Sequence, residues 1–161
     1  MYIGTQDLLK QYDAYLLEHG YQIEELVNLA SDALLNHFTQ YNRFAILIGP
    51  GNNGADGYSL GLKLEKQGKH VIYYYSGDIG KVSQANRYYR DQCEENHLIY
   101  VDEDNINTIN WNDYDCIVDG LFGFGLNSAP RGMYKIIIES IMNNYNGTIG
   151  AIDIPTGLDC N

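Results

Sequence analysis

Apolar and polar residues follow two different periods along the chain, and the change falls near residue 43. Before it, apolar residues recur at helical spacing, as Leu8, Leu9, Tyr12 and Leu16 do. After it, short apolar runs that end in glycine or polar residues predict buried strands, and the stretches between them are helical in spacing. The predicted helices are Thr5–His19, Glu24 to about His37, Tyr58–Gln67, Val82–Asn96 and Met133–Asn143. The predicted strands are Phe44–Gly49, His70–Tyr75, His97–Val101, Cys116–Phe122 and Thr148–Ile154.

Strands that alternate with helices predict right-handed crossovers and an α/β fold, a doubly wound, mostly parallel sheet with helices on both faces. The two helices before the first strand are extra elements. A length of 161 residues suits one such domain, so residues 1–161 are expected to form a single unit. Ligands of such folds bind at the carboxyl ends of the strands, here the residues after Ile48, Val118 and Ile152.

Charge and composition restrict the partners. Ten basic against 21 acidic residues give a net charge of −11, the wrong sign for gripping a nucleic acid, so no such partner is expected. No apolar run approaches the ~20 residues that span a bilayer, and the N-terminus lacks a signal-peptide pattern. We therefore expect no membrane contact and a cytoplasmic protein. Cys93, Cys116 and Cys160 form no CxxC pair and are expected to be reduced thiols.

The segment GPGNNGADG, residues 49–57, follows the first strand. Gly49, Gly51 and Gly54 fit the GxGxxG pattern of dinucleotide sites, where the backbone approaches the ligand and the next helix offers N–H groups to an anion. Asp78 stands near the end of the second strand, where a ribose-binding acid belongs. A simple tight turn explains the same glycines, and a Walker A loop is excluded because no Gly-Lys-Ser/Thr follows.

Two further segments carry an aspartate at a strand end. In VDGLFGFGLNSAPR, residues 118–131, Asp119 is costly to bury unless donors or a cation meet it, so it is a candidate cation ligand or a local turn cap. In AIDIPTGLD, residues 151–159, Asp153 follows an apolar strand, and desolvation there is expected to raise its pKa toward the range useful for acid–base catalysis. No HExxH, CxxC or GxSxG pattern supports a zinc site or a serine hydrolase.

Taken in order, two N-terminal helices, LIGPGNNGADG, VDGLFGFG with NSAPR, and IDIPTGLD make the chain resemble the YjeF N-terminal domain family, the NAD(P)H-hydrate epimerases. The resemblance implies a Rossmann-like fold and interconversion of the two C6 epimers of hydrated NADH and NADPH. A separate dehydratase then restores the S form to the working cofactor. It also implies a possible homodimer, with the stripe of Thr5–His19 packed across the two-fold axis.

The resemblance also assigns roles to individual residues. The metal ligands of the family, for one potassium ion per subunit, fall on Asn53, Asp119 and Thr156. The acid that contacts the substrate, and our candidate catalytic group, is Asp153. The other residues that would contact the substrate are Asn52, Asn53, Gly54, Ala55, Asp56, Gly123, Phe124, Gly125, Leu126, Asn127, Ser128 and Ala129. Oxygen donors of this kind suit a hard cation rather than zinc.

The chain departs from the family pattern in three places. Ala55 replaces the second glycine of NNGGD, which we expect to be tolerated unless φ is positive. Asn28 and Ser31 lie in LVNLAS, where the family shows LMExAG. Family members also continue for about another strand–helix–strand unit after the last motif, so we expect this chain to lack the C-terminal strands of the domain.

The expected mechanism moves a proton onto and off the C6 oxygen while positive charge builds toward the ring nitrogen, and one carboxyl group near C6 can carry that proton. The sequence does not distinguish between two routes for this epimerisation, loss and re-addition of the hydroxyl group or opening and closure of the ring. Two alternatives are an NAD(P)-dependent oxidoreductase and a non-catalytic binding or dimerisation module, as in related domains of decapping-enhancer proteins. The first lacks a Tyr-xxx-Lys relay, since Leu62 follows Tyr58 at that offset. The second is disfavoured by the net charge and by the presence of Asn53, Asp119 and Asp153.

Overall fold

A five-stranded, all-parallel sheet forms the centre of the protein in a computed structural model that describes residues 11, 14–123, 129–153 and 155–156. The strands are β1 (Arg43–Ile48), β2 (His70–Tyr75), β3 (Leu98–Tyr100), β4 (Cys116–Gly120) and β5 (Thr148–Ala151). Their order is β3-β2-β1-β4-β5, so the chain first winds outward from β1 to β3 and then returns to the other side of β1. The winding direction reverses between β1 and β4, where doubly wound folds bind their ligands.

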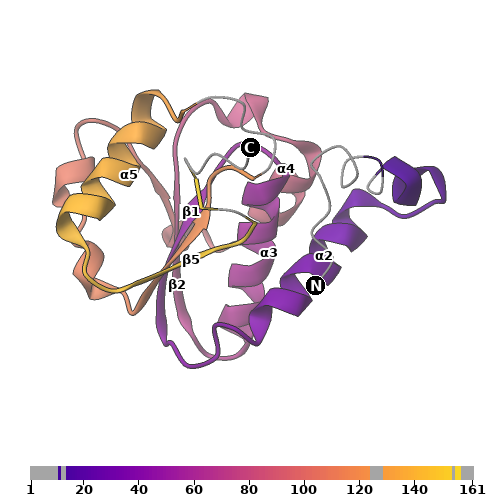
Figure 1. Cartoon of the computed structure of the whole chain (residues 1–161), viewed down its shortest axis with the longest axis horizontal. Helices are drawn as coiled ribbons and strands as arrows, with labels where there is room; N and C mark the ends of the chain where they lie inside the picture. The colour runs from indigo at the N-terminus through magenta and orange to yellow at the C-terminus, as the bar shows by residue number, and fades with distance from the viewer. Residues whose placement is uncertain (1–10, 12–13, 124–128, 154, 157–161) are drawn as a thin grey trace.

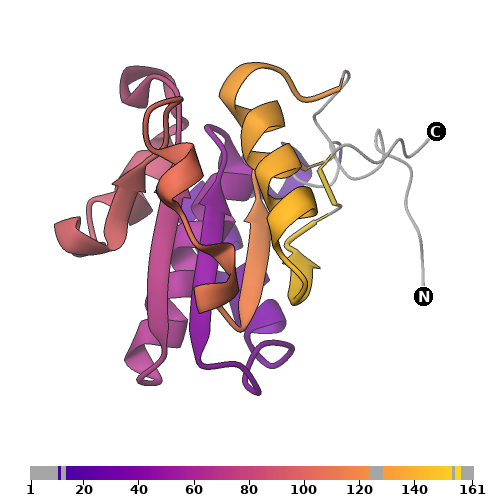
Figure 2. The same cartoon turned by 90° about the vertical axis from the view of Figure 1, so that its left-hand side faces the viewer.

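Helices cover both faces of this sheet (Figures 1 and 2). On one side lie α2 (Ile23–Leu35), α3 (Asn52–Lys66) and α4 (Gln84–Arg90), and on the other lies α5 (Gly132–Asn144). Short 3-10 turns span Ile79–Lys81, Glu95–His97, Ile106–Thr108 and Trp111–Asp113. Within the described residues, no helix combines the length and apolar character needed to cross a bilayer.

The side chains of β1 point alternately to the two faces of the sheet, and each face has its own hydrophobic core. Phe44, Ile46 and Ile48 pack with α2, α3 and α4, whereas Ala45 and Leu47 face the α5 side with Trp111. Side chains of neighbouring residues in a strand point to opposite faces, so a continuous apolar run is what a strand buried on both sides requires. The predicted α/β class and doubly wound parallel sheet are therefore confirmed.

The main differences from the predicted elements concern helices. α3 begins at Asn52 rather than Tyr58, because Gly54 and Gly57 pack against Gly49 and Ile48 and are held in the helix despite their low propensity. α4 covers only Gln84–Arg90 of the predicted Val82–Asn96. Residues 14–18 of the predicted first helix are helical, and most of the rest lies outside the described residues.

Helix α2 is attached to α3 by a cluster of polar contacts that is partly buried. The Lys63 ammonium donates to the Asn28 carbonyl at 2.6 Å, Ser31 Oγ at 2.7 Å and Asp32 Oδ1 at 2.6 Å. Ser31 is fully buried, and its hydroxyl also lies 2.8 Å from that of Ser59. The departure from the family pattern at position 31 is thus accommodated because α3 supplies hydrogen-bond partners for the serine.

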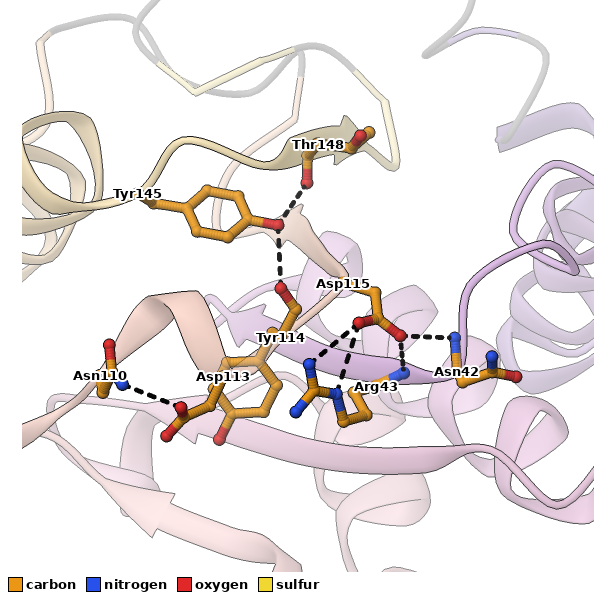
Figure 3. A network of polar contacts seen from close by, with 8 residues as sticks. All are labelled: Asn42, Arg43, Asn110, Asp113, Tyr114, Asp115, Tyr145 and Thr148. Atoms are coloured by element: carbon orange, nitrogen blue, oxygen red, sulfur yellow. Dashed lines mark hydrogen bonds and ion pairs between the residues drawn. The ribbon is translucent and has the colours of Figure 1, made fainter.

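The amino-terminal edge of the sheet is held by a separate network (Figure 3). Asp115, just before β4, accepts from the backbone N–H groups of Asn42 and Arg43 at 3.1 and 2.9 Å and from the Arg43 guanidinium at 3.2 and 3.3 Å. The Tyr145 hydroxyl lies 3.2 Å from the Thr148 carbonyl and 3.4 Å from that of Tyr114. These contacts fix the starts of β1, β4 and β5 and leave the opposite edge for ligands.

Candidate functional site

The candidate site lies where β1, β4 and β5 end. Ile48 lies opposite Gly120 in the parallel register, and the Gly49 N–H donates to the Gly120 carbonyl at 3.0 Å. The Ile152 N–H donates to the Asp119 carbonyl at 3.1 Å, which brings the segment after β5 to the same place. The three segments singled out in the sequence therefore meet at the switch point of the sheet.

Asp119 is the polar centre of this edge. The residue is 8% exposed, and its carboxylate accepts three hydrogen bonds, from the Thr156 N–H at 2.7 Å, the Thr156 hydroxyl at 2.8 Å and the Leu121 N–H at 3.1 Å. The Thr156 hydroxyl in turn accepts from the Phe122 N–H at 3.3 Å. Among the described residues, none of the ion pairs involves Asp119. Backbone and hydroxyl donors therefore meet this carboxylate, as its burial requires.

Asn53 lies in the first turn of α3, and its carbonyl approaches Gly120, where an added Cβ would come within 3.4 Å of it. The side-chain Nδ2 atom is buried and makes no hydrogen bond within the described part of the chain. A buried amide end without a partner is costly. Rotating the amide exchanges its nitrogen and oxygen, so this position can present an oxygen to a donor or a cation.

Asp153 lies beside Gly123. A Cβ added to Gly123 would stand 2.5 Å from Asp153 Oδ2, so the carboxylate rests where a larger residue would place its side chain. Asp153 is exposed. The expectation that the strand itself desolvates this carboxylate is therefore wrong, because the residue lies beyond the last hydrogen-bonded pair of β5.

The remaining predicted contact residues divide into three groups. Asn52 is exposed and Asp56 half-buried in the first turns of α3, on which Gly54 and Ala55 are buried. Ala55 is fully buried and has a negative φ, because the positive φ values among the described residues belong to four glycines. An alanine in place of the second glycine of NNGGD is therefore tolerated, as expected. Ala129 is exposed, and Phe124, Gly125, Leu126, Asn127 and Ser128 lie outside the described residues. Asp78 follows β2 but caps the turn of Ile79–Lys81 by accepting from the Gly80 N–H at 2.8 Å.

One buried residue at this edge is absent from the set predicted by sequence. Asn86 of α4 is 1% exposed, and its side-chain Nδ2 donates to the carbonyls of Gly49 and Gly51 at 2.8 and 3.2 Å. The sequence holds no signal for it, because Asn86 lies in an ordinary polar helical stretch, QANRYYR.

An open groove lies elsewhere on the described surface. It has a volume of about 580 Å³ on the outer side of α2, α3 and α4, and it contains none of the predicted site residues. Asn28 lines this groove, so in this chain position 28 lies on the helical surface and not at the strand ends.

A doubly wound sheet with a glycine turn, a helix N-terminus and the oxygen atoms of Asp119 and Thr156 at its switch point is typical of α/β domains that bind a ligand at that edge. Residues 23–161 match the family model described as YjeF-related protein N-terminus. The chain belongs to this family, and the resemblance seen in the sequence is confirmed.

Relatives and a solved structure agree with this assignment. A protein of Anaerococcus prevotii named NAD(P)H-hydrate epimerase is 35% identical over 83% of this chain, which spans 64% of that relative. One of Leuconostoc citreum with the same name is 30% identical over 99% of the chain and 71% of the relative. The crystal structure of the yeast protein YNL200c superposes with a TM-score of 0.85 over all of this chain and 73% of its own, at 23% identity, which shows the shared fold.

Proposed function

We propose that the protein interconverts the R and S epimers of hydrated NADH and NADPH at C6 of the nicotinamide ring, and so repairs damaged cofactor together with a dehydratase that consumes the S form. The meeting of Asn53, Asp119, Gly123, Asp153 and Thr156 at the switch point carries this proposal. It is supported by the names of the two relatives. These names favour neither an oxidoreductase nor a non-catalytic module. The cytoplasmic location stays a prediction from the sequence.

Asp153 is the group that would move the proton. In the dehydration route, the carboxylic acid protonates the C6 hydroxyl, which leaves as water, and the carboxylate takes a proton from the water that adds to the other face. In the ring-opening route, the carboxylate takes the proton of the C6 hydroxyl as the C6–N bond breaks and an aldehyde forms, and it returns the proton when the ring closes on the other face. The exposure of Asp153 leaves it accessible to substrate, and the missing side chain of Gly123 gives its carboxylate the space that a Cβ would occupy. A nicotinamide ring lying over it would supply the desolvation that the chain does not.

The N-terminus of α3 would hold the phosphates of the dinucleotide. Gly51 caps this helix in an extended conformation, and the N–H groups of the first helical turn have no partner within the helix. Such N–H groups, together with the helix dipole, favour an anion. Because the net charge of −11 repels anions, a diphosphate needs local backbone N–H donors of this kind to bind.

The donor set of Asn53, Asp119 and Thr156 fits a potassium ion, which we propose as a cofactor. An amide oxygen, a carboxylate and a hydroxyl or carbonyl are hard oxygen ligands, and the unpartnered amide end of Asn53 is the group in this set that lacks a hydrogen bond. When bound, the ion would supply positive charge that helps to hold the diphosphate of the substrate. Asp119 and Thr156 then keep the turns after β4 and β5 together.

The catalytic role is tested with Asp153→Asn, which keeps the shape of the side chain but cannot exchange the proton. We expect binding of hydrated NADPH within a few-fold of wild type and a rate of epimerisation lower by about 10²–10⁴-fold. The assay follows conversion of the purified R epimer to S by chromatography, with the spontaneous rate subtracted. Asp104→Asn, at an exposed carboxylate after β3, is the matched control. Undiminished conversion by Asp153→Asn would assign the chemistry to another residue.

The ion is tested by comparing melting temperatures in potassium and in lithium, because a ligand bound by the native state raises the melting temperature. We expect potassium to stabilise the wild type and to have no such effect on Asp119→Ala, which should also bind the dinucleotide more weakly. A variant that responds to potassium like the wild type contradicts the proposed ligand set.

We also propose that the protein is a homodimer. Tyr15 and Leu17, at the start of the chain that the structure describes, are 53% and 44% exposed, as residues of a contact between subunits would be in a single chain. Light scattering at micromolar concentration should give twice the mass of the chain, and a species of 18.2 kDa would refute the dimer.

A further inference from the structure

The first turn of α4 holds three consecutive carbonyl groups of the turn between β1 and α3. The Asn86 side chain donates to Gly49 O at 2.8 Å and to Gly51 O at 3.2 Å, and the backbone N–H of Ser83 donates to Pro50 O at 2.9 Å. Because both acceptors of the Asn86 side chain are carbonyls, only its NH₂ group fits there, and the orientation of the amide is fixed. Asn86 is itself held by the Ser83 hydroxyl, which accepts its backbone N–H at 3.2 Å.

Fixing these carbonyls also fixes the direction of the N–H groups. In a planar trans peptide the C=O and the following N–H point in opposite directions, and the described residues contain no cis peptide. When the carbonyls of Pro50 and Gly51 point toward α4, the N–H groups of Gly51 and Asn52 point away from it. The Pro50 carbonyl is held by the Ser83 N–H, and the Gly51 carbonyl also accepts the Ala55 N–H at 3.3 Å. Asn86 therefore acts together with these backbone contacts in setting which groups the turn presents to a ligand, although it lies on the opposite side of the turn.

The packing around Asn86 leaves little freedom for another arrangement. A Cβ on Gly54 would stand 2.6 Å from Asn86 Nδ2 and 2.0 Å from the Gly49 carbonyl oxygen. A Cβ on Gly49 would in turn stand 1.6 Å from the Leu121 carbonyl oxygen. The asparagine, the two glycines and the residue after β4 thus pack closely against one another, and the turn has little room for another conformation.

We propose that Asn86 is a positioning residue for the substrate, and that its side-chain amide keeps the turn of residues 49–51 in the conformation that presents backbone N–H groups to the diphosphate of the dinucleotide. This inference rests on the proposed function. Asn86 makes no contact with the reacting carbon, so it acts on the affinity for the dinucleotide and leaves the proton transfer at Asp153 unchanged.

The test replaces Asn86 with leucine, which has nearly the same shape and no donor. Titration calorimetry with NADPH should show affinity lower by about 10–100-fold, and kinetics with the R epimer should show KM raised by a similar factor and kcat within about 3-fold of wild type. Tyr89→Phe is the matched control. It removes another hydrogen bond of α4, from the Tyr89 hydroxyl to the Glu24 carbonyl at 2.7 Å, without touching the turn. It should bind NADPH within about 2-fold of wild type.

Asn86→Ser retains one donor and is the second variant to test if the leucine variant does not fold. Its affinity for NADPH should be several-fold lower than that of wild type, with kcat retained. Wild-type affinity in a folded Asn86 variant, or an equal loss in Tyr89→Phe, would overturn the positioning role while the proposed function stands. A loss of kcat with KM unchanged would also overturn it. If the wild type binds neither NADPH nor its hydrate, the proposed function fails and the positioning role fails with it.

Discussion

Replacing Asp119 with asparagine tests whether its carboxylate holds the turns after β4 and β5 together. Asp119 Oδ1 accepts from the Leu121 N–H and the Thr156 hydroxyl, and Oδ2 accepts from the Thr156 N–H at 2.7 Å. Asparagine has one acceptor oxygen, so in either orientation of its amide an NH₂ group faces a backbone N–H. The variant therefore loses at least one hydrogen bond to a charged acceptor and leaves a donor unsatisfied.

The size of the effect follows from the burial of this cluster. Asp119 is 8% exposed and Leu121 is 2% exposed, so water replaces little of the lost bonding. A hydrogen bond to a charged group contributes about 1.5–3 kcal/mol, and an unsatisfied buried donor costs about 1–3 kcal/mol. Allowing for relaxation of the turn, we expect the free energy of unfolding to fall by about 2–4 kcal/mol, which corresponds to about 5–15 °C in Tm for a domain of this size.

The assay is equilibrium unfolding in urea, followed by the fluorescence of Trp111, the single tryptophan, which is fully buried. The midpoint should move to lower urea with the slope m unchanged. Asp102→Asn is the matched control, because Asp102 accepts two backbone N–H groups, at 3.0 and 3.1 Å, through one oxygen that asparagine retains. The control should stay within about 0.5 kcal/mol of wild type. Equal midpoints for Asp119→Asn and wild type would refute this account of the cluster.

Three further outcomes are expected. Partial burial raises the pKa of the Asp115 carboxyl, but hydrogen bonds from two backbone N–H groups and a guanidinium have the larger effect, so the pKa is lowered. Asp115→Asn should therefore reduce the free energy of unfolding by about 1 kcal/mol at neutral pH. This folded-state pKa lies below the unfolded value, so the difference from wild type, measured by urea unfolding, should be complete above about pH 4 and shrink as the pH falls further. Gly54→Ala should lower the urea midpoint more than Gly51→Ala, whose added Cβ meets no atom within 4 Å, and equal midpoints would contradict the crowding. Burial raises the pKa of the Cys93 thiol to about 12 and that of the Cys116 thiol to about 11. Both thiols should therefore react with a thiol reagent at pH 8 far more slowly in the native than in the unfolded protein. Mass spectrometry of labelled peptides measures the two rates.

Local patterns in the sequence are enough to predict the sheet and the place of the site. Apolar runs such as FAILI can be satisfied only by burial on both faces, and this required strands with helices on each side. Parallel strands end at one edge, so Asp119 and the segment after β5 were expected to meet there, as they do. These conclusions follow from local patterns and from connectivity, which a sequence carries directly.

Contacts between distant segments arise from three-dimensional packing and could not be predicted from local patterns. Helix propensity places the start of α3 after Gly54 and Gly57, but the close approach of Gly54 to the Gly49 carbonyl moves it to Asn52. The role of Asn86 depends on a carbonyl 37 positions away, and no local pattern marks it. The exposure of Asp153 was decided in the same way, because the burial of a strand end depends on what other parts of the chain cover it. Local periodicity fixes which residues face a core, whereas hydrogen bonds and close approaches across the sheet edge depend on three-dimensional packing.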